Sequence, residues 1–173
     1  MLVNMNSTNR SDIFISVIQS NKGIIYKVAN SYCKSIDDRK DLVQEIIIQL
    51  WKSFDRYDET YKYSTWIYQI ALNTAISFYR KEARRKVINN PISESIFFFA
   101  DESTTDKDED ISLLQKFIQD LKELDRALML LYLEEKSYKE IAEIIGITET
   151  NVATKINRIK NILKKKFEQI NNR

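Results

Sequence analysis

The chain has 173 residues, 43% of them hydrophobic, and its 27 basic and 25 acidic side chains leave a net charge of +2. This composition excludes a wholly disordered chain and allows one medium domain or two small ones. Two glycines and one proline are too few for the turns of a sheet protein, and helix-favouring residues dominate, so an all-α fold is predicted.

The residue inventory also excludes several kinds of site. The single cysteine, Cys33, rules out a disulfide within the chain and favours a reducing compartment. Without histidine a zinc site is not expected, and no cofactor is predicted. The start, MLVNMNSTNRSD, has no apolar run of signal-peptide length, and no run of about eighteen apolar residues occurs. We therefore expect a cytoplasmic protein without membrane insertion.

Three helices are predicted in the N-terminal half, over residues 12–35, from 37 or 38 to 54, and 64–86. Gly23 weakens the middle of the first helix, and Ser64 is assigned as the N-cap of the third. The segment DRYDETYKY between the second and third helices is polar and aromatic, which predicts a loop.

The second predicted helix has two unlike faces at about 100° per residue. One face is apolar: Val43, Ile46, Ile47, Leu50 and Phe54. The other surrounds Ile48, with Trp51 at its edge, and is polar: Asp41, Gln44, Glu45 and Lys52. An apolar residue ringed by carboxylates and amides is typical of a partner-binding patch. A helix between two neighbours would instead bury Ile48 as core, and the residues leave both interpretations open.

The third predicted helix carries a core face and a separate polar stripe. The core face consists of Ile67, Ile70, Ala71, Thr74 and Phe78. The stripe changes from aromatic through amide and hydroxyl to cationic: Trp66, Gln69, Asn73, Ser77, Arg80 and Arg84. Aromatic rings stack unpaired bases, amides read base edges and arginines hold phosphates, so the stripe suits single-stranded nucleic acid. The residues alone favour the plainer alternative of a core tryptophan beside solvated polar groups.

Residues 87–110 break the helical pattern and predict a flexible linker between two domains, 10–86 and 111–170. Pro91 cannot continue a helix, NNPISES is typical of turns, and DESTTDKDED is acidic. The basic run RKEARRK precedes this segment and a lysine-rich tail follows from Lys155, which predicts two cationic surfaces. The run Phe97–Phe99 is odd for a linker, and either docking on a domain or a partner or a short strand-like patch would account for it.

Four helices are predicted after the linker, over residues 111–122, 125–134, 138–145 and 149–167. Ser137 and Glu140 have the spacing of a capping box, and Gly146 fits the left-handed position that ends such a helix. Thr148 then caps the last helix. The buried face of the helix between these signals is predicted to be Ile141, Ala142 and Ile145. This arrangement is typical of a helix-turn-helix.

The last predicted helix has an apolar side, which consists of Val152, Ile156, Ile159 and Leu163. Its other side is polar and cationic: Asn151, Thr154, Lys155, Asn157, Arg158 and Lys160. Polar groups near a helix start suit the major groove, and lysines further along suit phosphates. A helical hairpin with a solvated face is the alternative, but the lack of acidic residues from Asn151 to Phe167 favours DNA.

Three blocks together carry a family resemblance: DLVQEIIIQLWKSFDRYD, STWIYQIALNTAISFYRKEARR and LKELDRALMLLYLEEKSYKEIAEIIGITETNVATKINRIKNILKKKF. Their order and spacing resemble the extracytoplasmic-function (ECF) class of the sigma-70 family of bacterial RNA polymerase sigma factors, which keeps only sigma domains two and four. The resemblance covers nearly the whole chain after about residue 10. It implies a non-enzymatic subunit that binds core polymerase, at the clamp helices and the beta flap, and promoter DNA.

The resemblance also implies roles for individual residues. The contact with the clamp helices corresponds to Asp41, Gln44, Glu45, Ile48 and Trp51. The minus-ten element, with a flipped base read by Asn73, corresponds to Tyr57, Trp66, Asn73, Ser77, Arg80, Arg84 and Arg85. The minus-thirty-five element corresponds to Thr148, Thr150, Asn151, Thr154, Lys155, Asn157, Arg158 and Lys160. Here the helix start is poor in arginine, so readout is expected to use DNA shape as well as base contacts.

Two other function classes make different demands on the sequence. A stand-alone helix-turn-helix regulator would bind a palindrome as a dimer, but the sequence has no obvious coiled-coil seam. An enzyme would need positioned acid–base groups, and no such constellation or small-molecule substrate site is predicted. Factors of the resembled class are often held by an anti-sigma protein, which is the remaining partner that the resemblance suggests.

Overall fold

The structure is a computed structural model that describes the backbone of residues 3–89 and 106–171. Within these residues the chain forms seven α-helices, one 3-10 turn and no strand, so the all-α prediction is confirmed. The predicted turn at Pro91, the run Phe97–Phe99 and the first part of the acidic segment lie outside the described residues.

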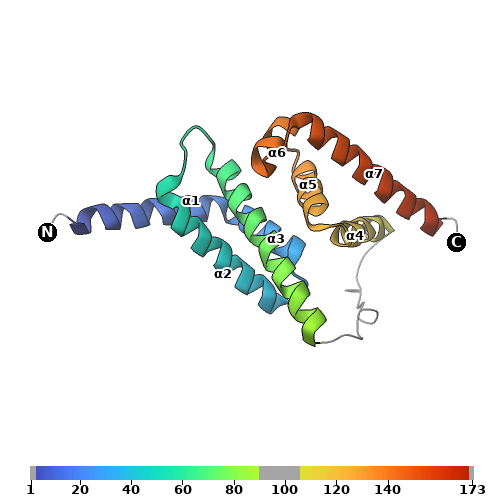
Figure 1. Cartoon of the computed structure of the whole chain (residues 1–173), viewed down its shortest axis with the longest axis horizontal. Helices are drawn as coiled ribbons and strands as arrows, with labels where there is room; N and C mark the ends of the chain where they lie inside the picture. The colour runs from blue at the N-terminus through green and yellow to red at the C-terminus, as the bar shows by residue number, and fades with distance from the viewer. Residues whose placement is uncertain (1–2, 90–105, 172–173) are drawn as a thin grey trace.

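The helices form two groups that follow the chain order (Figure 1). The N-terminal half comprises α1 (Val3–Tyr32), α2 (Ile36–Ser53), the 3-10 turn η1 (Phe54–Arg56) and α3 (Tyr63–Asn89). The C-terminal half comprises α4 (Asp106–Gln119), α5 (Glu123–Leu133), α6 (Tyr138–Ile145) and α7 (Glu149–Asn171). The helix predicted over 138–145 is reproduced at both ends, whereas α4 begins five residues before its predicted start at 111.

The junction between α1 and α2 corrects the predicted end of the first helix at residue 35. Ser35 serves the second helix instead, because its hydroxyl accepts a hydrogen bond from the backbone N–H of Asp38 at 3.0 Å. Such a side-chain cap satisfies one of the N–H groups that a helix start leaves without a partner. The first helix therefore ends at Tyr32, and the second begins at Ile36, earlier than predicted.

The start of α3 also differs from the prediction. The backbone N–H of Trp66 donates to the carbonyl of Lys62 at 3.2 Å, so the helical ladder begins before Ser64. Ser64 lies inside the first turn, and its assignment as the N-cap is wrong. The preceding segment contains a tight local turn, because the side chain of Asp58 accepts from the backbone N–H of Thr60 at 2.9 Å.

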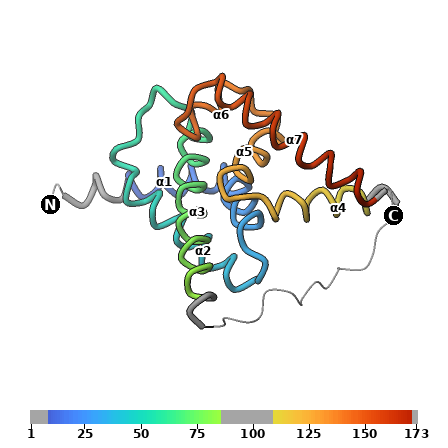
Figure 2. The backbone as a smooth tube through the Cα atoms, turned by 45° about the vertical axis from the view of Figure 1, so that its right-hand side comes forward, coloured from blue at the N-terminus to red at the C-terminus, as the bar shows by residue number. Residues whose placement is uncertain are grey.

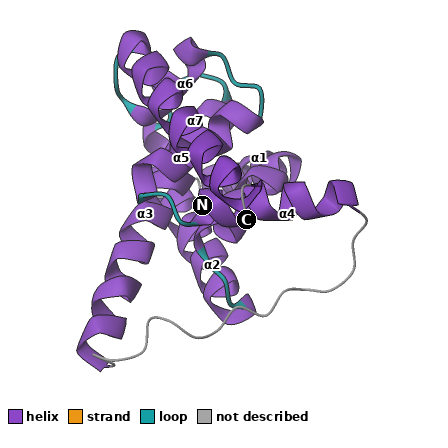
Figure 3. Ribbon diagram, turned by 90° about the vertical axis from the view of Figure 1, so that its right-hand side faces the viewer, coloured by secondary structure: helices purple, strands orange, loops and turns teal. Residues whose placement is uncertain are grey.

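The two groups of helices pack internally and against each other. α1, α2 and α3 contact one another, and α7 packs on α4, α5 and α6. The halves meet where α3 contacts α5 and α6 and where α1 contacts α5. Figure 2 shows α5 and α6 beside α3, and in Figure 3, viewed at right angles to Figure 1, α5 again lies next to α3. The buried side chains of both halves consequently form one hydrophobic cluster.

The buried face of α3 is wider than the face predicted from periodicity. The structure buries Trp66, Ile67, Tyr68, Ala71, Leu72 and Ala75. Ile70, Thr74 and Phe78, which were predicted to face the core, are only half-buried. The reason is that α3 has neighbours around most of its circumference: α1, α2, α5 and α6. A single apolar stripe at 3.6-residue spacing describes a helix with one covered face, not one enclosed by four helices.

Candidate functional site

A groove of about 800 Å³ lies between α2 and α3 in the N-terminal half. From α2 it is lined by Asp41, Gln44, Glu45 and Ile48, and from α3 by Ile70, Asn73, Thr74, Ser77 and Phe78, among others. The groove therefore brings together four of the five residues predicted to contact a protein partner and two of those predicted to contact DNA. Its lining combines apolar side chains with carboxylates, amides, hydroxyls and the cations Lys52, Arg56 and Lys81.

Ile48 occupies the exposed side of this groove. Its side chain is 45% exposed, so the alternative in which a neighbouring helix buries Ile48 as core does not hold among the described residues. Glu45, which also lines the groove, accepts a hydrogen bond from Gln49 at 2.7 Å. An exposed isoleucine beside oriented polar groups has the composition of a protein-binding patch.

Trp51, the fifth predicted partner residue, lies on a different side of α2. Its ring meets that of Phe14 edge-to-face at 5.0 Å between centroids. The guanidinium of Arg10 lies 4.0 Å from the Trp51 ring centroid and pairs with Asp55 at 2.6 Å. Trp51 thus joins α2 to α1, and the structure does not bring it into the groove with the other four residues.

An aromatic cluster lies where the loop after α2 meets the start of α3. Tyr57 stacks on Tyr63 with 4.4 Å between ring centroids and 17° between planes, and its ring lies 5.3 Å from that of Trp66. The Tyr57 hydroxyl donates to the carbonyl of Tyr61. Trp66 is only 7% exposed, so little of its ring is open for stacking on a base.

A smaller groove of about 430 Å³ borders this aromatic cluster. Its lining includes Arg56, Tyr61, Trp66 and Gln69 of the N-terminal half. Glu143 of α6 lines the same groove, so the C-terminal half contributes a carboxylate to a surface predicted to receive nucleic acid.

The far end of α3 is cationic and exposed, with Arg80, Arg84 and Arg85. Arg80 pairs with Glu123 of α5 at 3.1 Å, which ties this end of α3 to the C-terminal half. Arg85 pairs with Glu82 at 3.0 Å, one turn away on the same helix. The backbone hydrogen bond to the Glu123 carboxyl, followed by the hydrogen bond from Arg80, lowers the pKa of that carboxyl.

The turn between α6 and α7 has the predicted local geometry. The Ser137 hydroxyl accepts from the Glu140 backbone N–H at 3.2 Å, and the Glu140 carboxylate accepts from the Ser137 backbone N–H at 2.9 Å. This capping box lowers the pKa of Glu140, with the backbone hydrogen bond as the largest cause. Gly146 is left-handed at φ 79°, and Thr148 accepts from the backbone N–H of Asn151 at 3.2 Å.

The predicted burial of the two helices around this turn is confirmed for α7 and corrected for α6. Val152, Ile156, Ile159 and Leu163 of α7 are all buried. In α6 the buried residues are Ile141 and Ile144, whereas Ala142 and Ile145, which were predicted to be buried, are half-buried. Since α6 packs on α3 as well as on α5 and α7, its covered side is shifted from the one predicted for a free helical hairpin.

The polar face of α7 has an exposed start and a braced middle. The exposed residues at its start are Thr148, Thr150, Asn151 and Thr154, followed by Asn157, and Lys155 is half-buried. Further along, one Arg158 nitrogen donates to both carboxylate oxygens of Asp125 at 2.8 Å. Lys160 donates to the Tyr132 hydroxyl at 2.6 Å, and this hydrogen bond raises the pKa of the lysine.

Sequence reasoning missed the α5 residues that hold these cations and meet the N-terminal half. Asp125 and Arg126 are both buried although they are charged, and Glu123 pairs with Arg80. The available signal was the placement of adjacent charges at the start of the apolar run ALMLL. Charged residues are rarely buried unless they are paired, so their position next to a core helix was informative.

Two further features of the described residues concern metals and membranes. Across residues 3–89 and 106–171, no cluster of three or more potential metal-binding side chains occurs. Across the same residues, every helix is too short or too polar to cross a bilayer.

The comparisons with known families divide the chain as the geometry does. Residues 17–85 match the family model described as Sigma-70 region 2, and residues 111–163 match the one described as Sigma-70, region 4. The ECF RNA polymerase sigma factor SigM of Bacillus subtilis (strain 168) is 30% identical, covering 81% of this chain and 86% of its own. SigW of the same strain is 26% identical, covering 92% of this chain and 91% of its own.

Two solved structures share the fold. The structure of CnrH in complex with the cytosolic domain of CnrY has a TM-score of 0.66 at 16% identity, covering 92% of this chain and 90% of that one. The sigma factor RpoE in complex with the anti-sigma factor NepR from Bartonella quintana has a TM-score of 0.65 at 20% identity, covering 91% and 96%. At these identities the likeness shows the arrangement of helices alone.

Proposed function

The chain belongs to the ECF class of the sigma-70 family of RNA polymerase sigma factors, and we propose how its two halves divide promoter recognition between them. As a sigma factor it directs RNA polymerase to promoters, so a stand-alone regulator is not favoured. The proposed domains are 10–86 for core binding and the minus-ten element, 87–110 as linker and 111–170 for the minus-thirty-five element. Its proposed place is the cytoplasm, without catalytic activity of its own.

The groove between α2 and α3 carries the proposal for the N-terminal half. On the α2 side, Ile48 with Asp41, Gln44 and Glu45 would receive the clamp helices of the largest polymerase subunit. On the α3 side, Asn73 and Ser77 would face the unstacked strand of the minus-ten element. Core binding and strand capture would then share one groove, which supports the coupling of promoter melting to assembly with polymerase.

The base-reading pocket is proposed at the α3 side of this groove. Asn73 is exposed, and its amide can both donate to and accept from a base edge. Tyr57 and Trp66, which lie beside the smaller groove, would supply the aromatic neighbours of this pocket, with Trp66 supporting them from its buried position. Arg80, Arg84 and Arg85 would hold the backbone phosphates as the strand leaves the pocket.

The exposed start of α7 carries the proposal for the minus-thirty-five element. Thr148, Thr150, Asn151 and Thr154 offer hydrogen-bonding groups where a recognition helix enters the major groove. Lys155 and Asn157 follow on the same helix. Arg158 and Lys160, held by Asp125 and Tyr132, would present fixed cations to phosphates and position the helix.

The test is initiation by core polymerase from the same organism on its genomic DNA. The purified chain is expected to give discrete transcription starts. Asn73→Ala should lower initiation by about 5- to 150-fold, the range for losing a bidentate base contact of about 1–3 kcal/mol, while leaving core binding intact.

The matched control is Asn30→Ala, which removes an exposed amide from α1, away from the groove. Equal initiation by the two variants would contradict the role of Asn73. If the unmodified chain and both variants are folded but none of them gives discrete transcription starts, the proposed function itself is contradicted. An anti-sigma partner is also proposed, and co-purification with a protein that blocks initiation would test it.

A further inference from the structure

Arg158 is the only arginine of α7, and its position continues that of the residues proposed to read bases. Asn151, Thr154 and Arg158 are spaced by three and four residues, so they succeed one another along one side of the helix. Arg158 lies about 10 Å beyond Asn151 along the helix axis. Its side chain is 56% exposed. Spacing and exposure alone would therefore allow Arg158 either to read a base or to hold a phosphate.

The guanidinium group reads guanine through two parallel N–H donors, which meet the O6 and N7 acceptors of the base. An arginine side chain offers two such pairs of donors: Nε with Nη2 along its side, and Nη1 with Nη2 at its end. Nη2 belongs to both pairs. A group that occupies Nη2 therefore competes with guanine for either edge, whereas the single donors at Nε and Nη1 still suit a phosphate oxygen.

Asp125 of α5 occupies this shared nitrogen. Nη2 of Arg158 donates to both carboxylate oxygens of Asp125, at 2.8 Å each. The Asp125 side chain is only 11% exposed, so water screens the pair less than it would at the surface. The carboxylate also adds the attraction of a negative charge, which the uncharged O6 and N7 of guanine lack. The ion pair therefore holds the guanidinium against α5 in preference to a base edge.

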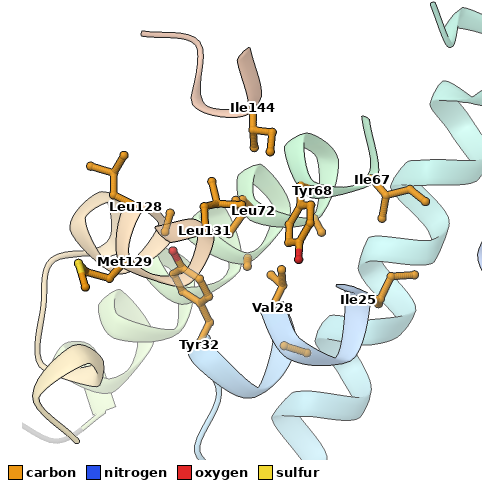
Figure 4. Close-up of a cluster of buried hydrophobic side chains, with 14 of the residues drawn as sticks. Ile25, Val28, Tyr32, Ile67, Tyr68, Leu72, Leu128, Met129, Leu131 and Ile144 are labelled. Atoms are coloured by element: carbon orange, nitrogen blue, oxygen red, sulfur yellow. The ribbon is translucent and has the colours of Figure 1, made fainter. Parts of the chain in front are cut away.

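The part of α5 that carries Asp125 is fixed by contacts of its own. The Tyr32 hydroxyl donates to the carbonyl of Glu123 at 2.6 Å, and Arg126 donates to the carbonyl of Ser31 at 3.2 Å. Figure 4 shows side chains of the following turns of α5 among those of the buried cluster, together with side chains of α1 and α3. Asp125 is consequently a fixed point, and the longer, exposed side chain of α7 adapts to it.

Lys160, a second cation in the middle of α7, is restrained in a similar way. Its Nζ donates to the Tyr132 hydroxyl at 2.6 Å and lies 4.1 Å from the centroid of the same ring. Lysine can also contact the O6 and N7 acceptors of guanine, so α5 restrains two groups that could select this base. Asn151 and Asn157 remain exposed on α7, and an amide pairs with adenine through N6 and N7.

We propose that Asp125 determines the base preference of α7 at the minus-thirty-five element without contacting DNA. It is a positioning residue: by holding Nη2 of Arg158, it confines this arginine to phosphate contacts, and guanine is not selected at the base pair that Arg158 faces. The exposed asparagines of α7 then favour adenine. This inference deepens the proposed function and rests on it, because it takes α7 as the helix that enters the major groove.

The first test leaves Asp125 in place. The base pairs around position minus thirty-five are randomised in a promoter found by the genomic initiation experiment, and transcripts of each sequence are counted with core polymerase. Arg158→Ala should lower initiation from all sequences alike and change the base preference at each position by no more than about twofold, because phosphate contacts do not specify sequence. The slope of promoter affinity against salt concentration should fall by about one, for one lost phosphate contact.

The second test releases the arginine. Asp125→Asn keeps the shape of the side chain and removes the charge that holds Arg158. A new preference for guanine of at least about fivefold should appear at one position, the lower end of the discrimination by a bidentate contact. Adding Arg158→Ala to this variant should abolish the new preference. A purely structural role of Asp125 would instead lower initiation equally from all sequences.

The matched control is Asp120→Asn. Asp120 is an exposed acid of the same half, and it pairs with Lys166 instead of Arg158. Both variants lose one negative charge, so any general gain in affinity for DNA should be equal. A guanine preference that appears only in Asp125→Asn supports the inference.

Three outcomes would overturn the inference. The first is a guanine preference in the unmodified protein that Arg158→Ala removes, and this comparison decides even if Asp125→Asn fails to fold. The second is an unchanged base preference in Asp125→Asn when circular dichroism shows the variant to be folded. In both cases the proposed function stands. The third is the absence of transcription from every sequence with the unmodified chain, which would overturn the proposed function as well.

Discussion

The two halves present their proposed binding surfaces in different ways. In the N-terminal half, three long helices create a groove by packing against each other, and the groups that line it, such as Ile48 and Asn73, are exposed. In the C-terminal half, a capping box and a glycine turn set the ends of α6, and two cations of the reading helix are fixed by side chains of α5. Packing between helices therefore shapes the first surface, whereas side-chain hydrogen bonds, both within the turn and from α7 across to α5, shape the second.

The largest expected effect removes the apolar centre of the open groove. Ile48→Glu should weaken binding of core polymerase by at least about 30-fold, the equivalent of about 2 kcal/mol for a central interface residue. Ile13→Glu is a matched control, because Ile13 and Ile48 are both 45% exposed. Titration of each labelled variant with core polymerase measures the difference. Equal losses would mean that the groove is not the polymerase contact.

The braced cations of α7 should be coupled to α5 energetically. Asp125→Ala, Arg158→Ala and the double variant form a cycle whose coupling in the free energy of unfolding is expected to be about 1 kcal/mol or more. The exposed pair Lys164 and Glu168 provides the comparison cycle, with an expected coupling of at most about 0.5 kcal/mol. Urea unfolding of each variant gives both coupling energies. If the effects of Asp125→Ala and Arg158→Ala on the free energy of unfolding are additive, the ion pair does not stabilise α7 against α5.

The two glycines should respond oppositely to alanine. Gly146→Ala places a Cβ at φ 79° and should destabilise the protein by about 1 kcal/mol, because the left-handed region is strained for alanine. Gly23→Ala lies within α1 and should stabilise by about 0.5–1 kcal/mol. Apart from the adjoining backbone and chain neighbours, no atom of the described residues lies within 4 Å of the added Cβ at either site, so backbone preference sets the sign. Thermal unfolding that moves in the same direction for both variants would contradict this.

The smallest expected signal is at the boundary between the halves. Burial, followed by the charge of Glu134 and a hydrogen bond with it, raises the pKa of Tyr68 to about 12. Since the folded state favours the neutral phenol, this contribution to stability is complete below about pH 10 and is lost as the pH rises through about 12. Tyr68→Phe should remove one of nine tyrosine ionisations from the late part of an absorbance titration. Loss of an early ionisation instead would be inconsistent with a buried Tyr68.

The contrast between the halves also explains what the sequence could predict. Ser137, Gly146 and Thr148 each act within a few residues of their own position, so the ends of α6 and the start of α7 followed directly from residue type. The buried side of α7 followed from its apolar spacing. The inward face of α3 did not, because α5 and α6 cover Tyr68 and Leu72, and no residue near α3 indicates that distant contact.

The candidate site residues also divide into those that the sequence could locate and those whose contacts only the folded structure shows. Resemblance to a family located Asn73 and the polar face around Ile48, and the structure brings these into one groove. It could not show that Trp51 packs on α1, or that Arg80 and Arg158 are paired with residues of α5. Those partners lie 43 and 33 residues away in the chain, and only the folded arrangement brings them together.

The hydrogen bonds that cross the interface between the two halves affect how far that interface can be detected from correlated substitutions in homologous sequences. Tyr32 donates to the carbonyl of Glu123, and Arg126 donates to the carbonyl of Ser31. A main-chain carbonyl is present whatever side chain the residue carries, so substitution at either acceptor would leave the bond in place. Correlated substitution between homologous sequences, which reports contacts between side chains, would therefore give little sign of these two bonds even where the halves have always touched.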